Sequence, residues 1–218
     1  MTAVLFDLDG TLADTAGDLG GAVNQMRVAR GMPAMSIESL RPYASAGARG
    51  LIGAGLKAQP DQPDLEDLRQ EFLANYESCL ANTTRLFDGV PSLLDQLDAM
   101  GCPWGVVTNK PHRYTVPVMQ ALGLMTRSSV TISGDSTAHA KPHPLPLLTA
   151  CERMGVSPGS TLYVGDDLRD IQAAQAAHMP SVAAAWGYLG TTHDIAQWGA
   201  DLICQQPMDI IALMSSQR

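Results

Sequence analysis

AVLFDLDGT, residues 3–11, joins a short apolar run to two acids, a glycine and a threonine. The run Ala3–Phe6 has no polar residue, which is typical of a strand buried on both faces of a parallel sheet. Because side chains alternate along an extended segment, Asp7 and Asp9 project to the same side of it. Gly10 then permits a turn that other residues resist. The stretch therefore predicts a first strand whose carboxyl end, where sites form in open α/β sheets, carries two neighbouring carboxylates.

Further apolar runs of the same kind recur along the chain, and helical patterns lie between most of them. One such pattern follows Pro91 and another precedes Gly123. This alternation predicts a Rossmann-like α/β core, an open parallel sheet with helices on both faces. The other predicted strands are Trp104–Thr108, Val130–Ser133, Thr161–Val164, Ser181–Ala184 and, more weakly, Leu202–Cys204.

The alternation is interrupted between Asp14 and about Arg85, where the sequence shows helical patterns and no convincing strand. We therefore expect a core made of residues 1–14 and 85–218, and a small all-helical insert, residues 15–84, that follows the first strand. The predicted helices of this insert cover roughly residues 16–30, 37–43, 46–57 and 64–81.

The composition is that of an ordinary globular chain with an excess of acid. Of its 218 residues, 14 are basic and 22 acidic, so the formal net charge is −8. We therefore expect no binding to nucleic acid or to an anionic membrane, and a small anionic substrate would need a local positive site. The N-terminus lacks the basic segment of a signal peptide, and no apolar run approaches the ~20 residues that span a bilayer. With four widely spaced cysteines, read as reduced thiols, these features predict a cytoplasmic protein.

Three other groups of polar residues add to the acids of the first strand. Thr108 and Asn109 can donate hydroxyl and amide hydrogen bonds to a phosphate oxygen. Lys141, which we expect to open a helix, could place its ammonium against a phosphate with help from the helix N-terminal amides. The acidic cluster Gly165–Asp170 offers the hard oxygen ligands that Mg²⁺ prefers.

Each group alone also has an ordinary structural interpretation. Asp7 and Asp9 could be solvated acids of a turn, Lys141 a surface lysine, and Gly165–Asp170 an acidic first turn that stabilises the next helix. Together, however, the groups supply a nucleophile, an acid and base, phosphate donors, a cation and metal ligands. Their combination therefore predicts phosphoryl transfer with a bound divalent cation.

In this order, the four groups resemble the four motifs of the haloacid dehalogenase superfamily of phosphohydrolases, over nearly the whole chain. The helical insert resembles the small cap of that superfamily, and the chain is most similar to its phosphoglycolate phosphatase group. Three short stretches look most similar to bacterial N-acetylmuramic acid 6-phosphate phosphatases. They are Ser45–Arg49, Trp104–Pro111 and Gly165–Ile171.

The resemblance implies a covalent mechanism that uses the two acids of the first motif. Asp7 would attack phosphorus and form an aspartyl-phosphate, and Asp9 would protonate the leaving alkoxide and later take a proton from water. Mg²⁺ would be held by the Asp7 carboxylate, the Asp9 backbone carbonyl and Asp166.

The remaining motif residues would assist this step. The resemblance implies that Thr108, Asn109 and Lys141 hold the equatorial phosphate oxygens. Either Asp167 or Asp170 would orient Lys141 or a metal-bound water. The expected partner is therefore a small phosphorylated metabolite, and the chain is expected to be a monomer or a homodimer.

Several alternatives stay open at this point. The second acid, Asp9, argues against a dehalogenase, and Lys57, the one lysine of the insert, lies at a helix end that does not suit a phosphonatase. A sugar-phosphate mutase shares the motifs, and a non-catalytic sensor of phosphorylated ligands could use the same fold. Arg49 could bind a substrate carboxylate or be a solvated helix residue. Since both N-acetylmuramic acid 6-phosphate and 2-phosphoglycolate carry a carboxylate, Arg49 does not choose between them.

Overall fold

The computed structural model of the protein describes residues 1–191 and 194–215. Within these residues, six parallel strands form one sheet in the order β5-β4-β1-β6-β7-β8. Each predicted apolar run overlaps one of the strands, so the predicted parallel sheet is confirmed. The strands are β1 (Ala3–Phe6), β4 (Trp104–Val107), β5 (Thr131–Ile132), β6 (Thr161–Gly165), β7 (Ser181–Ala184) and β8 (Leu202–Cys204).

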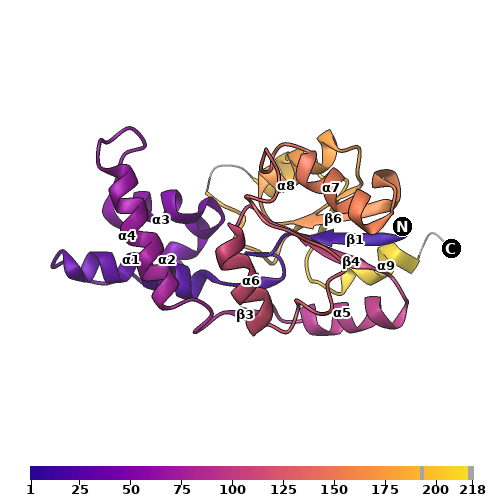
Figure 1. Ribbon diagram of the computed structural model, residues 1–218, viewed down its shortest axis with the longest axis horizontal. Helices are drawn as coiled ribbons and strands as arrows, with labels where there is room; N and C mark the ends of the chain where they lie inside the picture. The colour runs from indigo at the N-terminus through magenta and orange to yellow at the C-terminus, as the bar shows by residue number, and fades with distance from the viewer. Residues whose placement is uncertain (192–193, 216–218) are drawn as a thin grey trace.

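Helices cover both faces of this sheet, because the side chains of the central strand β1 alternate between two hydrophobic clusters. Val4 and Phe6 of β1 pack on one face, and Leu5 packs on the other. Figure 1 shows α5 and α9 below the sheet and α7 and α8 above it. The helices around the sheet are α5 (Val90–Ala99), α6 (His112–Ala121), α7 (Leu145–Met154), α8 (Leu168–Ala176) and α9 (Asp209–Ser215), with short 3-10 turns η2 (Pro158–Ser160) and η3 (Ile195–Gln197).

The register of the central strands brings the ends of three strands to the same level. Phe6 of β1 is opposite Val106 of β4 and Val164 of β6. The chain runs from β1 to one side of the sheet and later returns to β6 on the other side, so the strand order reverses here. Crevices at such reversal points are where ligands bind in open α/β sheets.

The helical insert, residues 15–84, forms most of a separate hydrophobic cluster, to which the core adds Tyr114 and Tyr188. Leu19 of α1, Leu51 of α3 and Phe72 of α4 are buried in it. In Figure 1 the insert lies at the end of the molecule away from the N-terminus, so β1 runs toward it. That this segment acts as a separate cap stays a prediction. Its helices are α1 (Ala16–Ala29), α2 (Ile37–Leu40), the 3-10 helix η1 (Arg41–Ala46), α3 (Gly47–Leu56) and α4 (Leu65–Ser78).

Two strands at the base of the insert were not predicted. β2 (Ala13–Asp14) and β3 (Arg85–Leu86) pair in antiparallel fashion, with Ala13 opposite Leu86 and Asp14 opposite Arg85. Two residues are too few to show a period of two in the sequence. The pair joins the places where the chain enters and leaves the insert.

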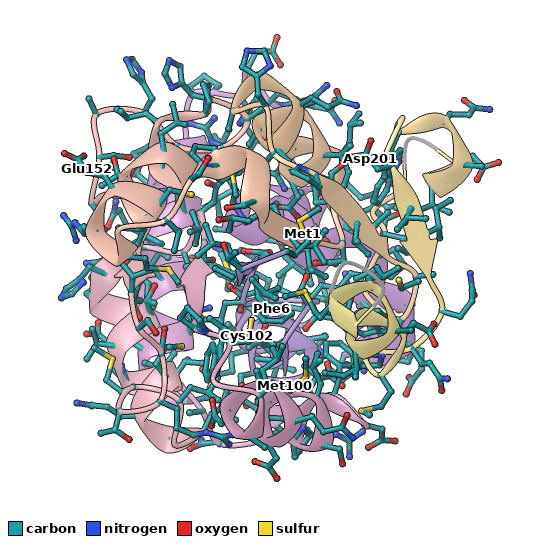
Figure 2. All side chains as sticks on the ribbon, turned by 90° about the vertical axis from the view of Figure 1, so that its right-hand side faces the viewer. Met1, Phe6, Met100, Cys102, Glu152 and Asp201 are labelled. Carbon is teal, nitrogen blue, oxygen red and sulfur yellow. The ribbon has the colours of Figure 1, made fainter. Side chains whose placement is uncertain are left out.

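Apolar side chains cover the end of the sheet that lies away from the insert. Figure 2 looks onto this end, where Met1, Met100 and Cys102 pack against the cluster that also contains Phe6. All four cysteines are free thiols. Among the described helices, none combines the length and the apolar character needed to cross a membrane.

Candidate active site

A cavity of about 460 Å³ lies between the carboxyl ends of the central strands and the helical insert. Every predicted site residue except Asp166 lines it, and Asp166 is fully buried. The sheet side contributes Asp7, Asp9, Thr108, Asn109, Lys110, Pro111, Tyr114, Lys141, Asp167, Arg169 and Asp170, and the insert contributes Leu19, residues 44–49, Glu66, Arg69, Phe72, Leu73 and Tyr76.

The ammonium of Lys141 is the centre of the buried charges. Its Nζ lies 2.8 Å from Asp7 Oδ1, 2.7 Å from Asp170 Oδ1, 2.8 Å from Tyr163 Oη and 2.9 Å from the Val107 carbonyl oxygen. Burial alone would lower the pKa of Lys141, but the neighbouring Asp170 and Asp7 outweigh it and raise that pKa. Lys141 is therefore charged and holds two carboxylates from different elements.

The expectation that Lys141 opens a helix is wrong, because α7 begins only at Leu145. A different contact holds Lys141 in its loop. Its backbone N–H donates to Asn109 Oδ1, and Asn109 Nδ2 donates to the Lys141 carbonyl, both at 2.9 Å. Asn109 thus uses both ends of its side-chain amide on Lys141, which lies before α7 and not in its first turn. Thr108 lines the cavity, and its Oγ1 accepts from the Lys110 backbone N–H.

Three carboxylates lie close enough to share a cation. Asp7, Asp166 and Asp170 each offer an oxygen, and these oxygens lie within 4.8 Å of one another. Burial raises the pKa of Asp7 to about 7, and Asp170 and Asp9 add to this rise while Lys141 opposes it. Burial, Asp7 and Asp170 raise the pKa of Asp166 well above its usual value. A hard divalent cation would relieve this repulsion, so the donor set fits Mg²⁺.

Asp166 is oriented by three donors around it. It accepts hydrogen bonds from Thr11 Oγ1 at 2.9 Å, from the Tyr188 backbone N–H at 2.9 Å and from Ser45 Oγ at 3.4 Å. The position of Asp166 also explains why glycine occupies positions 10 and 187. A Cβ on Gly10, whose φ is +89°, would lie 2.1 Å from Asp166 Oδ2, and a Cβ on Gly187 would lie 2.2 Å from Asp166 Cβ. Only glycine leaves room for this carboxylate.

The side chain of Asp9 has separate partners and lies outside the carboxylate cluster of the described residues. Its Oδ1 accepts from Thr15 Oγ1 at 2.6 Å and from Lys110 Nζ at 2.9 Å. Lys110 is itself buried, with its Nζ 4.8 Å from the centre of the Tyr76 ring. Sequence reasoning assigned Lys110 no role, although its place next to Thr108 and Asn109 in a lysine-poor chain was a usable signal.

The two remaining acids, Asp170 and Asp167, bind different partners. Asp170 accepts from Lys141 and, through Oδ2, from the Asp167 backbone N–H at 3.1 Å. Asp167 is the N-cap of α8 and pairs with Arg169, whose Nε lies 2.7 Å from Asp167 Oδ1. Of the two candidates for orienting Lys141, Asp170 is therefore the one in contact with it, and Asp167 serves the start of α8.

A comparison with known protein families shows the family to which the chain belongs. Residues 4–184 match the family described as haloacid dehalogenase-like hydrolase. The chain belongs to this family. As a haloacid dehalogenase-like hydrolase, it matches the family over a range that includes all four groups of site residues described above.

Two relatives of high sequence identity are named as phosphatases. The chain is 48% identical to a phosphoglycolate phosphatase of Xanthomonas campestris, over 94% of this chain and 92% of that one. It is 42% identical to the N-acetylmuramic acid 6-phosphate phosphatase of Pseudomonas aeruginosa, over 98% and 95%. A crystal structure of a predicted phosphoglycolate phosphatase from Haemophilus somnus superposes with a TM-score of 0.84 at 29% identity, covering 98% of each chain. The prediction that the chain is a phosphoric monoester hydrolase is therefore confirmed for the enzyme class.

Replacing Gly10 by alanine should damage the carboxylate cluster. Gly10→Ala adds left-handed strain, which costs roughly 1–2 kcal/mol, and a Cβ that displaces Asp166. Gly101→Ala is the control, because Gly101 also has a positive φ, +63°, but no atom within 4 Å of the new Cβ. We expect a larger loss of unfolding free energy in urea, and weaker Mg²⁺ binding by calorimetry, for Gly10→Ala. Equal results for the two variants would contradict the assigned crowding.

Removal of the central ammonium should destabilise the fold. Lys141→Met leaves Asp7 and Asp170 buried without their shared cation, and the loss of one partner of a buried pair costs about 3–5 kcal/mol. The exposed Lys57→Met is the control and should change little. The double variant Lys141→Met with Asp170→Asn should recover part of the loss, because it removes one unpaired charge. Additive losses in urea unfolding would argue against the assigned coupling.

Proposed function

We propose that the chain is a Mg²⁺-dependent phosphatase that hydrolyses N-acetylmuramic acid 6-phosphate, with Asp7 as the nucleophile. The observation that carries the proposal is the Asp7 carboxylate on the cavity wall, held by Lys141 and grouped with Asp166 and Asp170. We also propose, from the sequence, that the helical insert acts as the cap and that the enzyme works in the cytoplasm in the recycling of peptidoglycan.

Asp7 has the environment expected of a nucleophilic carboxylate. Lys141 fixes Oδ1, and among the described residues no hydrogen bond is made by Oδ2, which we assign to the attack. This oxygen would form a bond to phosphorus while the bond from phosphorus to the ester oxygen breaks. The product is an aspartyl-phosphate on Asp7, and the difficult hydrolysis becomes two easier steps.

Asp9 would handle the proton in both steps. Thr15 and Lys110 fix its Oδ1, and the side chain lines the same cavity. In the first step it would give its proton to the leaving alkoxide, so the alcohol leaves neutral. In the second step it would take a proton from water as that water attacks the aspartyl-phosphate, which releases phosphate and restores Asp7.

The cations would make the approach of phosphate to Asp7 possible. Asp7, Asp166 and the Asp9 backbone carbonyl would hold Mg²⁺, which when bound would supply positive charge against the phosphate oxygens. Thr108 would donate its hydroxyl proton to an equatorial oxygen. Since the Asn109 side chain is bound to Lys141, we assign it the placement of that lysine rather than a side-chain contact to phosphate.

The size and lining of the cavity favour the larger of two substrates. A volume of about 460 Å³ lies within the range of sites that hold ligands well beyond the size of 2-phosphoglycolate. The lining also includes the aromatic residues Phe72, Tyr76 and Tyr114, whose rings suit the apolar faces of a sugar ring and its substituents. 2-Phosphoglycolate stays the second candidate, because the phosphoglycolate phosphatase of Xanthomonas campestris is 48% identical to this chain.

The nucleophile is tested by Asp7→Asn with p-nitrophenyl phosphate as the ester. We expect turnover to fall on the order of 10³-fold or more, because the attacking group is lost, and wild-type turnover to vanish on addition of EDTA. Asp61→Asn, in an exposed loop, is the control and should keep parental turnover. Parental turnover by a folded Asp7→Asn protein would remove the mechanism. Absence of metal-dependent turnover by the wild type on any ester would favour a sensor.

The substrate is tested with a pair of sugar phosphates that differ by one group. N-Acetylmuramic acid 6-phosphate carries a lactyl carboxylate that N-acetylglucosamine 6-phosphate lacks, and Arg49 on the cavity wall could pair with it. Arg49→Ala should lower kcat/KM roughly 10- to 100-fold for the first compound and little for the second, since one charge-assisted bond contributes about 1.5–3 kcal/mol. Arg153→Ala, on α7, is the control.

Three outcomes of this panel would change the assignment. Equal losses on both compounds would remove Arg49 from carboxylate recognition. A wild-type preference for 2-phosphoglycolate would select the second candidate. Formation of an isomeric sugar phosphate instead of free phosphate would identify a mutase.

A further inference from the structure

Arg169 links the loop after β6 to the helical insert. It lies in the first turn of α8, and its Nη2 donates to the backbone carbonyl of Ser45 at 2.5 Å, across 124 residues of sequence. The same guanidinium grips Asp167 with two bonds, from Nε at 2.7 Å and from Nη2 at 3.0 Å. Asp167 thus orients the Arg169 guanidinium, and Arg169 binds the insert through the Ser45 carbonyl.

The needs of the helix do not explain this residue. A cation in the first turn of a helix opposes the helix dipole, so arginine is disfavoured at this place. Asp167 compensates the charge locally, but a smaller neutral residue would serve the start of α8 equally well. The contact that requires a long, planar cation with several donors is the one that reaches Ser45 while Asp167 is still bound.

Ser45 belongs to the part of the insert that lies over the carboxylates. Its Oγ is 3.4 Å from Asp166 Oδ2, and residues 44–49, which include Arg49, line the cavity. The other end of η1 is held by Arg41, which pairs with Asp14 through two bonds of 2.8 and 3.0 Å. Both ends of η1 are therefore bound to the rest of the molecule. The contact made by Arg169 is the one next to Ser45, the residue that also contacts Asp166.

Arg169 also stands between two cavities. It lines the main cavity and a second one of about 280 Å³, and it shares this position with Asp167 and Ala46. The second cavity is lined further by residues of the insert, such as Tyr43, and of the core, such as Trp198. Truncation of Arg169 would remove part of the wall between them and enlarge the space beside the site.

We propose that Arg169 is a specificity-determining positioning residue, which fixes the segment Ser45–Arg49 over the cavity and so selects leaving groups that contact this segment. This inference rests on the proposed function and deepens it. Esters with a large, polar leaving group, such as a sugar acid phosphate, depend on the placed segment for binding. Esters with a small or flat leaving group depend on it much less.

The test compares Arg169→Ala with the wild type on N-acetylmuramic acid 6-phosphate and p-nitrophenyl phosphate. We expect KM for the sugar phosphate to rise roughly tenfold or more, the size of a lost charge-assisted bond, and to rise far more than KM for the flat ester. Hydrogen–deuterium exchange of residues 41–50 should become faster, because the segment loses its hold. Arg127→Ala is the control, since Arg127 pairs with Asp95 and Asp98 away from the cavity and should leave both readouts unchanged.

Two further variants sharpen the result. Arg169→Lys has a compact ammonium that cannot donate to Asp167 and Ser45 in the geometry of a planar guanidinium. We therefore expect its exchange rate and its KM to lie between those of the wild type and Arg169→Ala. This variant replaces Arg169→Ala in the test if Arg169→Ala does not fold. Ser45→Ala keeps the carbonyl that Arg169 binds, so its exchange over residues 41–50 should change less than in Arg169→Ala.

Unchanged exchange over residues 41–50, or equal changes of KM on both esters, would overturn the proposal and leave Arg169 as a local partner of Asp167. Failure of the proposed function is distinguishable, because it would show in the wild type as absent hydrolysis of both esters. The exchange experiment would in that case still decide whether Arg169 holds the segment.

Discussion

The crowding of three carboxylates around one buried ammonium is the constraint on which the site depends. Asp7, Asp166 and Asp170 come from the ends of two neighbouring strands and the first turn of a helix, and Lys141 reaches two of them. Like charges so close destabilise one another, and burial increases the effect. The fold tolerates this arrangement because parallel register places the strand ends together and because the ammonium is fixed by its own loop. A site that is strained without a divalent cation is well prepared to bind one.

Much of the fold could be predicted from the sequence, because strands buried on both faces have continuous apolar runs. Ala3–Phe6 and Ser181–Ala184 coincide with β1 and β7 to the residue. The β2–β3 pair could not be found, since its residues differ from a loop only in a long-range pairing. Such pairings depend on contacts between residues far apart in sequence, which a local pattern does not contain.

The site was predictable as a set of residues and less so as a set of contacts. Motif order named the groups that line the cavity, but Lys141 is placed by Asn109 and not by a helix start. Lys110 beside Asp9 and Arg169 beside Ser45 were not assigned roles, because each acts on a residue more than a hundred positions away. Sequence spacing identifies chemical types, whereas tertiary packing decides which of them meet.

The short β2–β3 pair has a consequence for the history of such chains. Because Asp14 and Arg85 are direct neighbours across this pair, the chain leaves the sheet layer and comes back at almost the same point in space. A genetic exchange of everything between these two residues would alter no strand of the main sheet. New substrate preferences can therefore be acquired by recombination at one junction, while Asp7, Asp9, Lys141 and Asp166 are inherited together in the rest of the chain.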